Sequence, residues 1–177
     1  MKHIIAFAGS NSTTSINKQL ATYASGLVEG AKAEVLDLND FDVPLFSTDL
    51  EKSMGGQPEN AHKLFNKIKE ADGMVISLAE HNGAYASVFK NLFDWISRIE
   101  AKTFLGKPML LMATSPGARG GQSVLTIAED RFPRHEADIV GVFSLPQFGN
   151  NFSEGKITNK ELNDQLLVEV DKFQNAI

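Results

Sequence analysis

The sequence predicts an α/β fold in which a five-stranded parallel sheet is covered by helices on both faces. Short apolar runs alternate along the chain with longer amphipathic stretches, which is typical of strands that alternate with helices. The apolar runs are continuous rather than alternating with polar residues, as expected for strands that are buried on both faces. Because the 177 residues contain no linker, repeat or low-complexity tract, we expect one domain, residues 1–177.

The elements follow from these runs in chain order. The expected strands are residues 3–8, 33–38, 73–78, 108–114 and 138–143. The expected helices are residues 17–28, 59–71 and 84–99, one helix within 121–134, and a last helix that runs to about Phe173. Residues 39–47 and 53–58 are expected to be loops. The last helix is predicted to begin at Thr158, because Glu161 three residues later completes a capping box.

For a chain of this length we expect the flavodoxin-like strand order 2-1-3-4-5, in a three-layer sandwich. In such a sheet the strand order reverses between strands 1 and 3, and ligands bind outside the carboxyl ends of the strands at that point. The loops after strands 1, 3 and 4 are therefore the expected place for a binding site.

Composition excludes several classes of function. The net charge of −5 gives no basic excess for binding a nucleic-acid backbone or an anionic membrane. The absence of cysteine excludes disulfides, thiol catalysis and Cys-ligated metals, and the four histidines show no ligand spacing, so we predict no metal site. No apolar run approaches the length of a membrane span or a signal peptide, which predicts a cytoplasmic protein with no membrane partner.

The loop after the first strand predicts a phosphate site. Residues 9–17 combine a glycine, a row of hydroxyl side chains and the start of a helix. A helix N-terminus offers free N–H groups and partial positive charge to an anion. The loop lacks the glycine spacing of a dinucleotide fold and the Gly-Lys of a P-loop, so a phosphate monoester fits better than a pyrophosphate. A hydroxyl-rich helix cap without any ligand is the alternative.

The other two loops predict the walls of a site for a flat ligand. Glu80-His81-Asn82-Gly83 follows the third strand, and we expect a tight turn there, rather than a hairpin, with backbone groups pointing outward. His81 can stack on a planar ring or lie exposed. In residues 114–121, three glycines allow a close backbone approach to a flat ligand. Arg119 can contact a substrate phosphate or carboxylate, form a subunit ion pair, or be solvated.

With these loops placed, the chain resembles the NADPH-dependent FMN reductase family, flavodoxin-like enzymes that include quinone, chromate and azo-dye reductases. The resemblance covers nearly the full length. The stretches that carry it are Gly9-Ser10 with Ser15-Ile16-Asn17 and Leu20, Asp37-Leu38 with Val43-Pro44-Leu45-Phe46 and Asp49-Leu50, Glu80-His81-Asn82-Gly83 with Lys90-Asn91 and Asp94-Trp95, and Ser115-Pro116-Gly117 with Gly120-Gly121. The chain departs from the family at Ser12, where an arginine is common, and at Ala79 and His81, where proline and tyrosine are usual. Lys18 is a second cation that can compensate for the missing arginine.

The resemblance implies an FMN-dependent NAD(P)H oxidoreductase in which the flavin carries the chemistry and no side chain acts as a catalyst. The implied phosphate ligands are Ser10, Ser12, Ser15, Ile16 and Asn17, and the implied ring contacts are Glu80, His81, Asn82, Gly83, Ser115, Gly117 and Gly120. Arg119 and His81 are the implied substrate contacts. NADPH or NADH and then a quinone, free flavin or similar small acceptor would use one ring face in turn, which gives ping-pong kinetics.

The resemblance also implies a homodimer or homotetramer. Residues 84–99 carry more apolar side chains than one core-facing stripe needs, which favours a helix shared between the core and a dimer interface; a deeply buried helix is the alternative.

Two other functions remain open at this point. One is a non-enzymatic flavodoxin-like electron carrier, which would usually be more acidic and would flank its flavin with aromatic side chains. The other is a protein that has lost flavin binding, for which Ser12 is the evidence.

Overall fold

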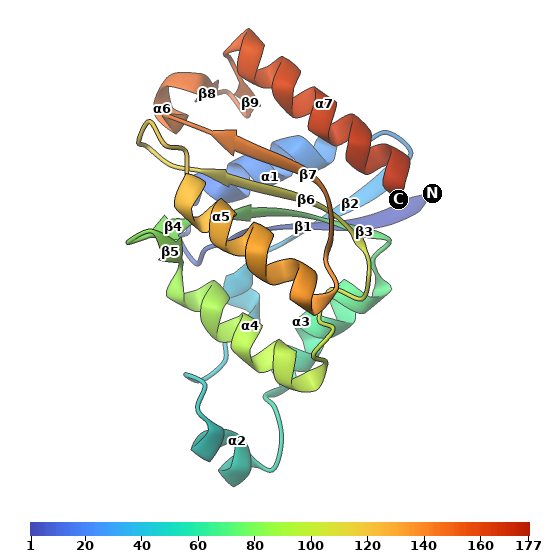
Figure 1. Ribbon diagram of the computed structural model, residues 1–177, viewed down its shortest axis with the longest axis vertical. Helices are drawn as coiled ribbons and strands as arrows, with labels where there is room; N and C mark the ends of the chain where they lie inside the picture. The colour runs from blue at the N-terminus through green and yellow to red at the C-terminus, as the bar shows by residue number, and fades with distance from the viewer.

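The computed structural model describes residues 1–177. At its centre is a five-stranded sheet in the order β2-β1-β3-β6-β7, in which every neighbouring pair is parallel (Figure 1). The strands are β1 (Lys2–Gly9), β2 (Ala31–Leu36), β3 (Gly73–Leu78), β6 (Pro108–Thr114) and β7 (Asp138–Leu145). Counted along the chain, these are strands 1 to 5 in the order 2-1-3-4-5, so the predicted flavodoxin-like topology is confirmed.

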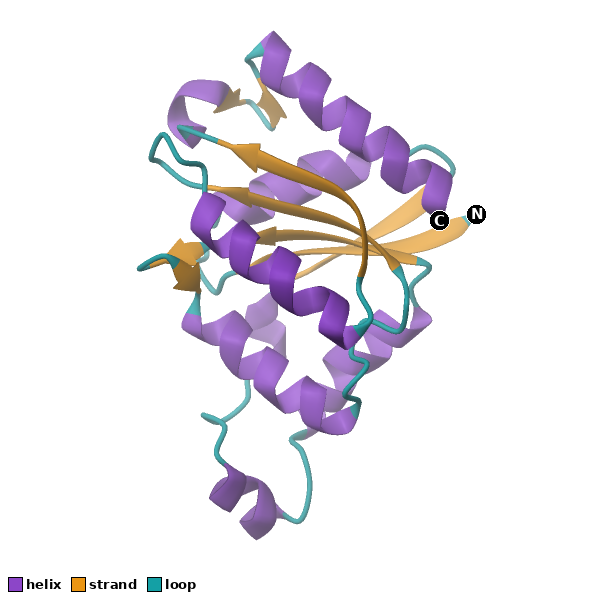
Figure 2. Cartoon of the chain, in the orientation of Figure 1, coloured by secondary structure: helices purple, strands orange, loops and turns teal.

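Helices cover both faces of this sheet (Figure 2). α1 (Ile16–Gly26) and α7 (Lys160–Ala176) pack on one face, and α3 (Glu59–Glu70), α4 (Ser87–Ile99) and α5 (Gln122–Arg131) pack on the other. Successive strand residues point to opposite faces. In β1, Ile4 and Ala6 join the core on the α1 side, whereas Ile5 and Phe7 join the core on the α4 side. The apolar runs are continuous because each face has its own core.

Several short elements were not expected from the sequence. They are the helices α2 (Thr48–Met54) and α6 (Phe148–Asn151), the 3-10 turns η1 (Leu38–Phe41) and η2 (Phe132–His135), and two antiparallel pairs, β4 (Glu80–His81) with β5 (Ala84–Tyr85) and β8 (Phe152–Ser153) with β9 (Lys156–Ile157). α4 consequently begins at Ser87, three residues later than predicted, because residues 84 and 85 belong to β5.

The start of α7 corrects the predicted capping box. The Asn159 side chain accepts the Leu162 N–H at 3.2 Å and caps the helix, which then runs from Lys160 to Ala176. Thr158 lies before the cap, where its N–H donates to the Asn151 carbonyl at 2.8 Å. Both residues can cap a helix, and the tie to Asn151 holds Thr158 outside it.

Residues 42–58 form an arm that extends from the body of the protein and carries α2 near its tip (Figure 1). One stripe of α4 anchors this arm. The Asn91 side chain accepts the Phe46 N–H at 2.8 Å, Trp95 Nε1 donates to the Pro44 carbonyl at 2.7 Å, and Arg98 Nε donates to both carboxylate oxygens of Glu51 at 3.1 and 3.0 Å. The spacing of 91, 95 and 98 places these side chains on one helix face. Asn91 and Trp95 of the family-like motif therefore hold the arm.

The apolar surface of α4 is covered within one chain. Phe89, Leu92, Phe93, Trp95 and Ile96 are all at most 5% exposed. They pack in the core formed with α3, α5 and η2. The surplus of apolar residues on this helix thus matches the deeply buried alternative, and it no longer argues for a dimer. None of the helices combines the length and the apolar character that crossing a bilayer requires.

The arm provides a test of this packing. Asn91→Ala removes the acceptor for the Phe46 N–H and the donor to the Pro44 carbonyl at 3.0 Å. We expect it to lower the free energy of unfolding by about 1–3 kcal/mol. Limited proteolysis should then cut within residues 43–58 faster than in the unaltered protein.

Lys90→Ala is the matched control, since Lys90 forms only an exposed i,i+4 ion pair with Asp94 at 2.7 Å. Its loss should change the free energy of unfolding by about 0.5 kcal/mol or less. Equal losses for the two variants, measured by urea unfolding, would show that Asn91 does not anchor the arm.

Candidate functional site

The three predicted loops meet at the carboxyl edge of the sheet. A cavity of ≈ 320 Å³ opens there, between the loops that follow β1, β3 and β6. Its lining residues are Ser10, Ser12, Thr14, Ser15, Ile16, Asn17, Ala79, Glu80, His81, Thr114, Ser115 and Pro116. Asn82, Gly83, Gly117 and Gly120 belong to the same loops but do not line the cavity.

Sequence reasoning missed four of the lining residues: Thr14, Ala79, Thr114 and Pro116. Thr14 belongs to the hydroxyl row that was already recognised. Thr114 ends β6 and Ala79 follows β3, so the rule that ligands gather at strand ends could have found them. No cluster of three or more His, Asp or Glu side chains capable of holding a metal ion is present.

The loop after β1 is organised by its own hydroxyls. Ser10 Oγ accepts the Ser12 N–H at 3.1 Å, Ser12 Oγ accepts the Thr14 N–H at 3.3 Å, and Ser15 Oγ caps α1 by accepting the Lys18 N–H at 3.1 Å. The backbone N–H groups of Ile16 and Asn17 donate to no group of the chain. These are the free donors that the first turn of a helix leaves open. The loop thus offers two N–H groups and several hydroxyl protons to an anion.

The Asn17 side chain points to the sheet. It is 3% exposed, and Nδ2 donates to the Thr114 carbonyl at 3.1 Å. Oδ1 accepts the Ser77 hydroxyl at 2.7 Å and the Thr114 N–H at 3.0 Å. The amide therefore joins α1 to the ends of β3 and β6. Asn17 can serve a phosphate through its backbone N–H, while its side chain holds the strands.

No lysine or arginine lines this cavity. Lys18 Nζ lies 2.5 Å from Asp37 Oδ2. The hydrogen bond from Lys18, followed by the bond from the Asn39 N–H, lowers the pKa of Asp37 below its usual value. Lys18 also does not line the cavity. The donors at the start of α1 that line this cavity are therefore neutral, and compensation for Ser12 by Lys18 stays a prediction.

The loop after β3 is a hairpin, and the prediction of a turn without one is wrong. Glu80 pairs with Tyr85 and His81 with Ala84, and Asn82 and Gly83 form the turn with φ of 52° and 75°. Two successive positive φ angles are the conditions under which Asn-Gly closes a two-residue hairpin. The turn carries Asn82 and Gly83 beyond the cavity, and it leaves His81 exposed at the rim.

Glu80 ties this hairpin to helix α5. Its Oε2 accepts the Val124 N–H at 3.0 Å, in the first turn of α5. A carboxylate is favoured at this position by the partial positive charge of the helix start. Behind the hairpin, Tyr85 packs against Phe89 and Phe132, and its buried hydroxyl has no hydrogen-bond partner. Burial raises the pKa of Tyr85 to about 12.

The glycines after β6 approach the chain itself. A Cβ on Gly120, at φ 57°, would lie 2.9 Å from the Pro146 nitrogen, and one on Gly121, at φ 79°, would lie 2.8 Å from Ala113 Cβ. Gly117 accepts the Gln147 N–H at 2.9 Å. The packing of the chain itself therefore requires glycine at positions 120 and 121, while ligand contact by Gly117 and Gly120 stays a prediction. Gly120 lets the loop pack against the end of β7, and Gly121 lets it pack against β6.

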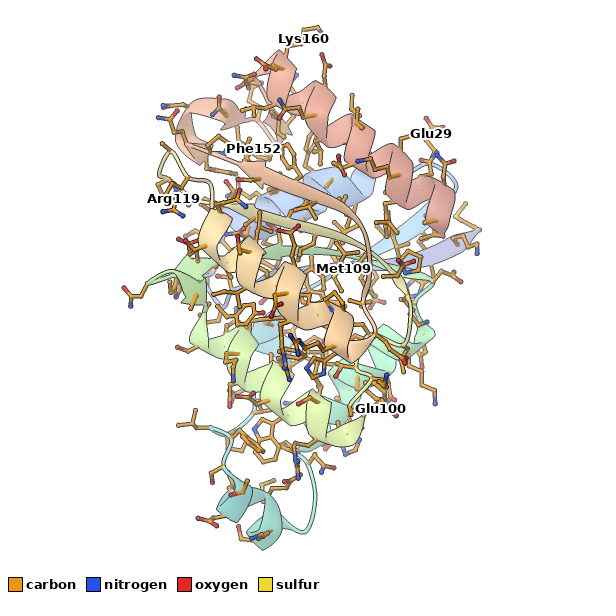
Figure 3. All side chains as sticks on the ribbon, in the orientation of Figure 1. Glu29, Glu100, Met109, Arg119, Phe152 and Lys160 are labelled. Atoms are coloured by element: carbon orange, nitrogen blue, oxygen red, sulfur yellow. The ribbon has the colours of Figure 1, made fainter.

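Arg119 lies on the outside of this loop (Figure 3). It is exposed, and its Nη2 donates to the Ser123 hydroxyl at 3.2 Å. Nothing on the protein holds it over the cavity. A role in substrate binding stays a prediction, as does ligand binding by the twelve residues predicted to hold the cofactor.

Comparison with known proteins bears on this site. The model of the NADPH-dependent FMN reductase family matches residues 2–150. This chain belongs to that family. The resemblance seen in the sequence is therefore confirmed.

Among curated relatives, the chain is 36% identical over 80 residues to a quinone reductase of Escherichia coli, a match that covers 45% of this chain and 42% of that protein. It is 32% identical over 124 residues to the NADPH:quinone oxidoreductase of Arabidopsis thaliana, covering 68% and 61%. It is 30% identical over 118 residues to an NAD(P)H-dependent FMN reductase of Pseudomonas aeruginosa, covering 66% and 62%. The matches thus span between 42% and 62% of these relatives' lengths.

Solved structures share the fold of this family member. A flavoenzyme NAD(P)H:(acceptor) oxidoreductase from Paracoccus denitrificans superposes with a TM-score of 0.79 at 24% identity, covering 99% of this chain and 97% of that one. An oxidoreductase from Corynebacterium diphtheriae gives a TM-score of 0.74 at 20% identity, covering 100% and 97%. These similarities show that the fold is shared over the length of this chain.

The Asn17 clamp in this FMN reductase family member can be tested by substitution. Asn17→Ala leaves the buried Ser77 hydroxyl and the Thr114 backbone without partners. We expect the free energy of unfolding to fall by about 2–4 kcal/mol. Asn11→Ala is the control, because the Asn11 side chain is exposed and forms no hydrogen bond; its effect should stay within about 0.5 kcal/mol. A loss for Asn17→Ala as small as that of the control would contradict the clamp.

Tyr85 provides a test through pH. Because its folded pKa lies above the unfolded value of about 10, the stability that it contributes is fully present below pH 10 and is lost as the pH rises toward 12. Tyr85→Phe should therefore flatten the fall in stability above about pH 10. At neutral pH it should be neutral or stabilising by up to about 1 kcal/mol, since no hydrogen bond is lost.

Tyr23→Phe is the matched variant, since the Tyr23 hydroxyl donates to Asn163 at 2.7 Å. It should lower the free energy of unfolding by about 1 kcal/mol at neutral pH. Chemical unfolding at several pH values measures both variants. A clear loss of stability for Tyr85→Phe at neutral pH would mean that its hydroxyl has a partner.

Proposed function

We propose that the protein is an FMN-dependent NAD(P)H oxidoreductase that passes hydride from NADPH or NADH to a quinone, a free flavin or a similar small acceptor. The observation that carries this proposal is the pair of unused N–H groups at Ile16 and Asn17, flanked by serine hydroxyls, at the carboxyl edge of the sheet. In a member of the NADPH-dependent FMN reductase family, such a donor set suits the phosphate of FMN.

In this proposal the residues of the chain bind FMN and orient its ring. The hydroxyls of Ser10, Ser12 and Ser15, with the N–H groups of Ile16 and Asn17, hold the phosphate. Residues 80–83 and 115–120 form the two walls beside the ring, and the Glu80 bond to Val124 ties the first wall to α5, which follows the second wall in the chain. When bound, FMN supplies reversible hydride transfer at its N5 atom.

The open rim of the cavity supports the ping-pong order, because it would leave one face of the flavin ring accessible to substrates. His81 is exposed at the cavity rim, and Arg119 is exposed on the neighbouring loop, where both can contact a substrate. The cavity lining contains no Phe, Tyr or Trp. An electron carrier would use such side chains to cover its flavin, so their absence favours an enzyme whose substrates stack on the ring in turn.

We further propose self-association as a homodimer or homotetramer, in the cytoplasm. Support for association comes from the arm rather than from α4. Leu45, just before α2, is 82% exposed, and Met54, the last residue of α2, is 46% exposed. Large apolar side chains on an extended arm favour contact with a second copy of the chain.

The activity is tested directly with purified protein, FMN and a quinone. We expect NADPH or NADH to be consumed steadily, with parallel lines in double-reciprocal plots at several quinone concentrations, as a ping-pong order requires. FMN binding without turnover would favour the electron carrier. Absence of FMN binding at micromolar flavin would contradict the proposal itself.

Ser12→Arg tests the position of the phosphate. A charge-assisted bond is about twice as strong as a neutral one, so we expect the dissociation constant for FMN to fall by about tenfold. Ser53→Arg on α2 is the control, because it adds the same charge on the arm, outside the cavity. Unchanged affinity for Ser12→Arg, or an equal gain for the control, would place the phosphate elsewhere.

A further inference from the structure

A second cavity adjoins the proposed phosphate site. It measures ≈ 630 Å³ and runs along the outer side of α1 to the β8–β9 hairpin; we call it the α1 groove. Thr14 and Ser15 line both this groove and the cavity at the carboxyl edge of the sheet. A ligand whose phosphate sits at the start of α1 could therefore continue into the groove.

The far part of the groove has an ordered aromatic wall. Tyr23 and Phe152 meet edge to face, with ring centroids 6.0 Å apart and an interplanar angle of 86°. Phe152 lies in β8, above α1 (Figure 3). The Tyr23 hydroxyl is held by Asn163 at 2.7 Å, so the ring is fixed in place. Such a wall suits a flat heterocycle, because aromatic faces stack on bases without reading their edges.

The charges along α1 are compatible with a pyrophosphate as well as with a single dianionic phosphate. A phosphate monoester carries about −1.5 to −2 charges at neutral pH, whereas each phosphate of a pyrophosphate diester carries only one. The donors at the start of α1 are neutral, and they can hold one singly charged phosphate of such a diester. The Lys18 ammonium lines the groove and not the first cavity. It has three donors, of which Asp37 takes one, so it can also meet a second phosphate.

We propose that this protein binds a flavin dinucleotide, FAD, as well as FMN, with the adenylate half of FAD in the α1 groove. The first phosphate occupies the hydroxyl loop, the second lies near Lys18, and the adenine lies against Tyr23. This inference rests on the proposed flavin site and adds a second subsite to it. The helix is about 16 Å long, which gives the adenylate room along its side.

Thr22→Trp is designed to fill the groove without touching the phosphate loop. Thr22 is exposed on α1, lines the groove and is absent from the first cavity. Thr126→Trp on α5 is the matched control, since each threonine is exposed on a helix and donates to the carbonyl four residues earlier, at 2.8 and 3.0 Å. Gly26→Phe is a second blocking variant at the far end of the groove, where a Cβ would meet nothing within 4 Å.

The experiment is a flavin-fluorescence titration of apo-protein with FMN and with FAD, after circular dichroism has shown that each variant is folded. We expect the unaltered protein to bind FAD within about tenfold of FMN. Thr22→Trp or Gly26→Phe should raise the dissociation constant for FAD by at least about tenfold and change that for FMN by less than about twofold. Thr126→Trp should leave both dissociation constants unchanged.

FAD affinity that neither blocking variant alters would overturn the inference, because the adenylate would then lie in solvent. The same holds if FAD binds more than about a hundredfold more weakly than FMN. In both cases FMN binding stands and the proposed function is unaffected. If neither flavin binds, the proposed function fails, and the inference fails with it.

Discussion

The hydrogen bonds of Asn17 are the constraint on which the candidate site depends. One buried amide joins the first turn of α1 to Ser77 at the end of β3 and to Thr114 at the end of β6. These are the places from which the second and third loops leave the sheet. An unpaired buried polar group costs free energy, and a displaced α1 would leave several such groups unpaired at once. The clamp thereby fixes the distance between the free N–H groups of α1 and both walls of the cavity.

The other ties at this edge follow the same arrangement. Glu80 joins the β3 hairpin to α5, and Gly120 lets the β6 loop lie against the end of β7. Each of these two loops is thus held by a neighbouring helix or strand. What remains free is a set of neutral donors at the start of α1 and an exposed rim at His81. This combination suits a cofactor bound through its phosphate with one open face, and Thr14 and Ser15 beside these donors also line the α1 groove.

Much of this arrangement is predictable from the sequence. The five apolar runs gave strands near their observed positions, and the strand order then placed the three loops together. The short elements were missed for identifiable reasons. α2 has no buried residue, so no apolar period marks it. The arms of the Asn82-Gly83 hairpin are two residues long, too short for any alternation to be visible.

Side-chain roles within the site were harder to predict. The sequence indicates that Asn17 lies at a helix start, but only the fold shows that its amide points to the strands rather than outward. Likewise, a glycine-rich loop looks the same whether the glycines approach a ligand or the chain, and Gly120 proves to approach the chain. The pairing of Lys18 with Asp37 joins residues from separate elements, which no local pattern reveals.

The central claim is that a flavin phosphate sits on the free N–H groups of α1. Amide chemical shifts measured during parallel titrations with FMN and with riboflavin, which lacks the phosphate, test it most directly. We predict that the Ile16 and Asn17 amide protons move downfield with FMN and stay in place with riboflavin, whereas the amides of residues 80–83 respond to both flavins. Binding of FMN that leaves the Ile16 and Asn17 amides unmoved, or that riboflavin reproduces at those amides, would contradict the account.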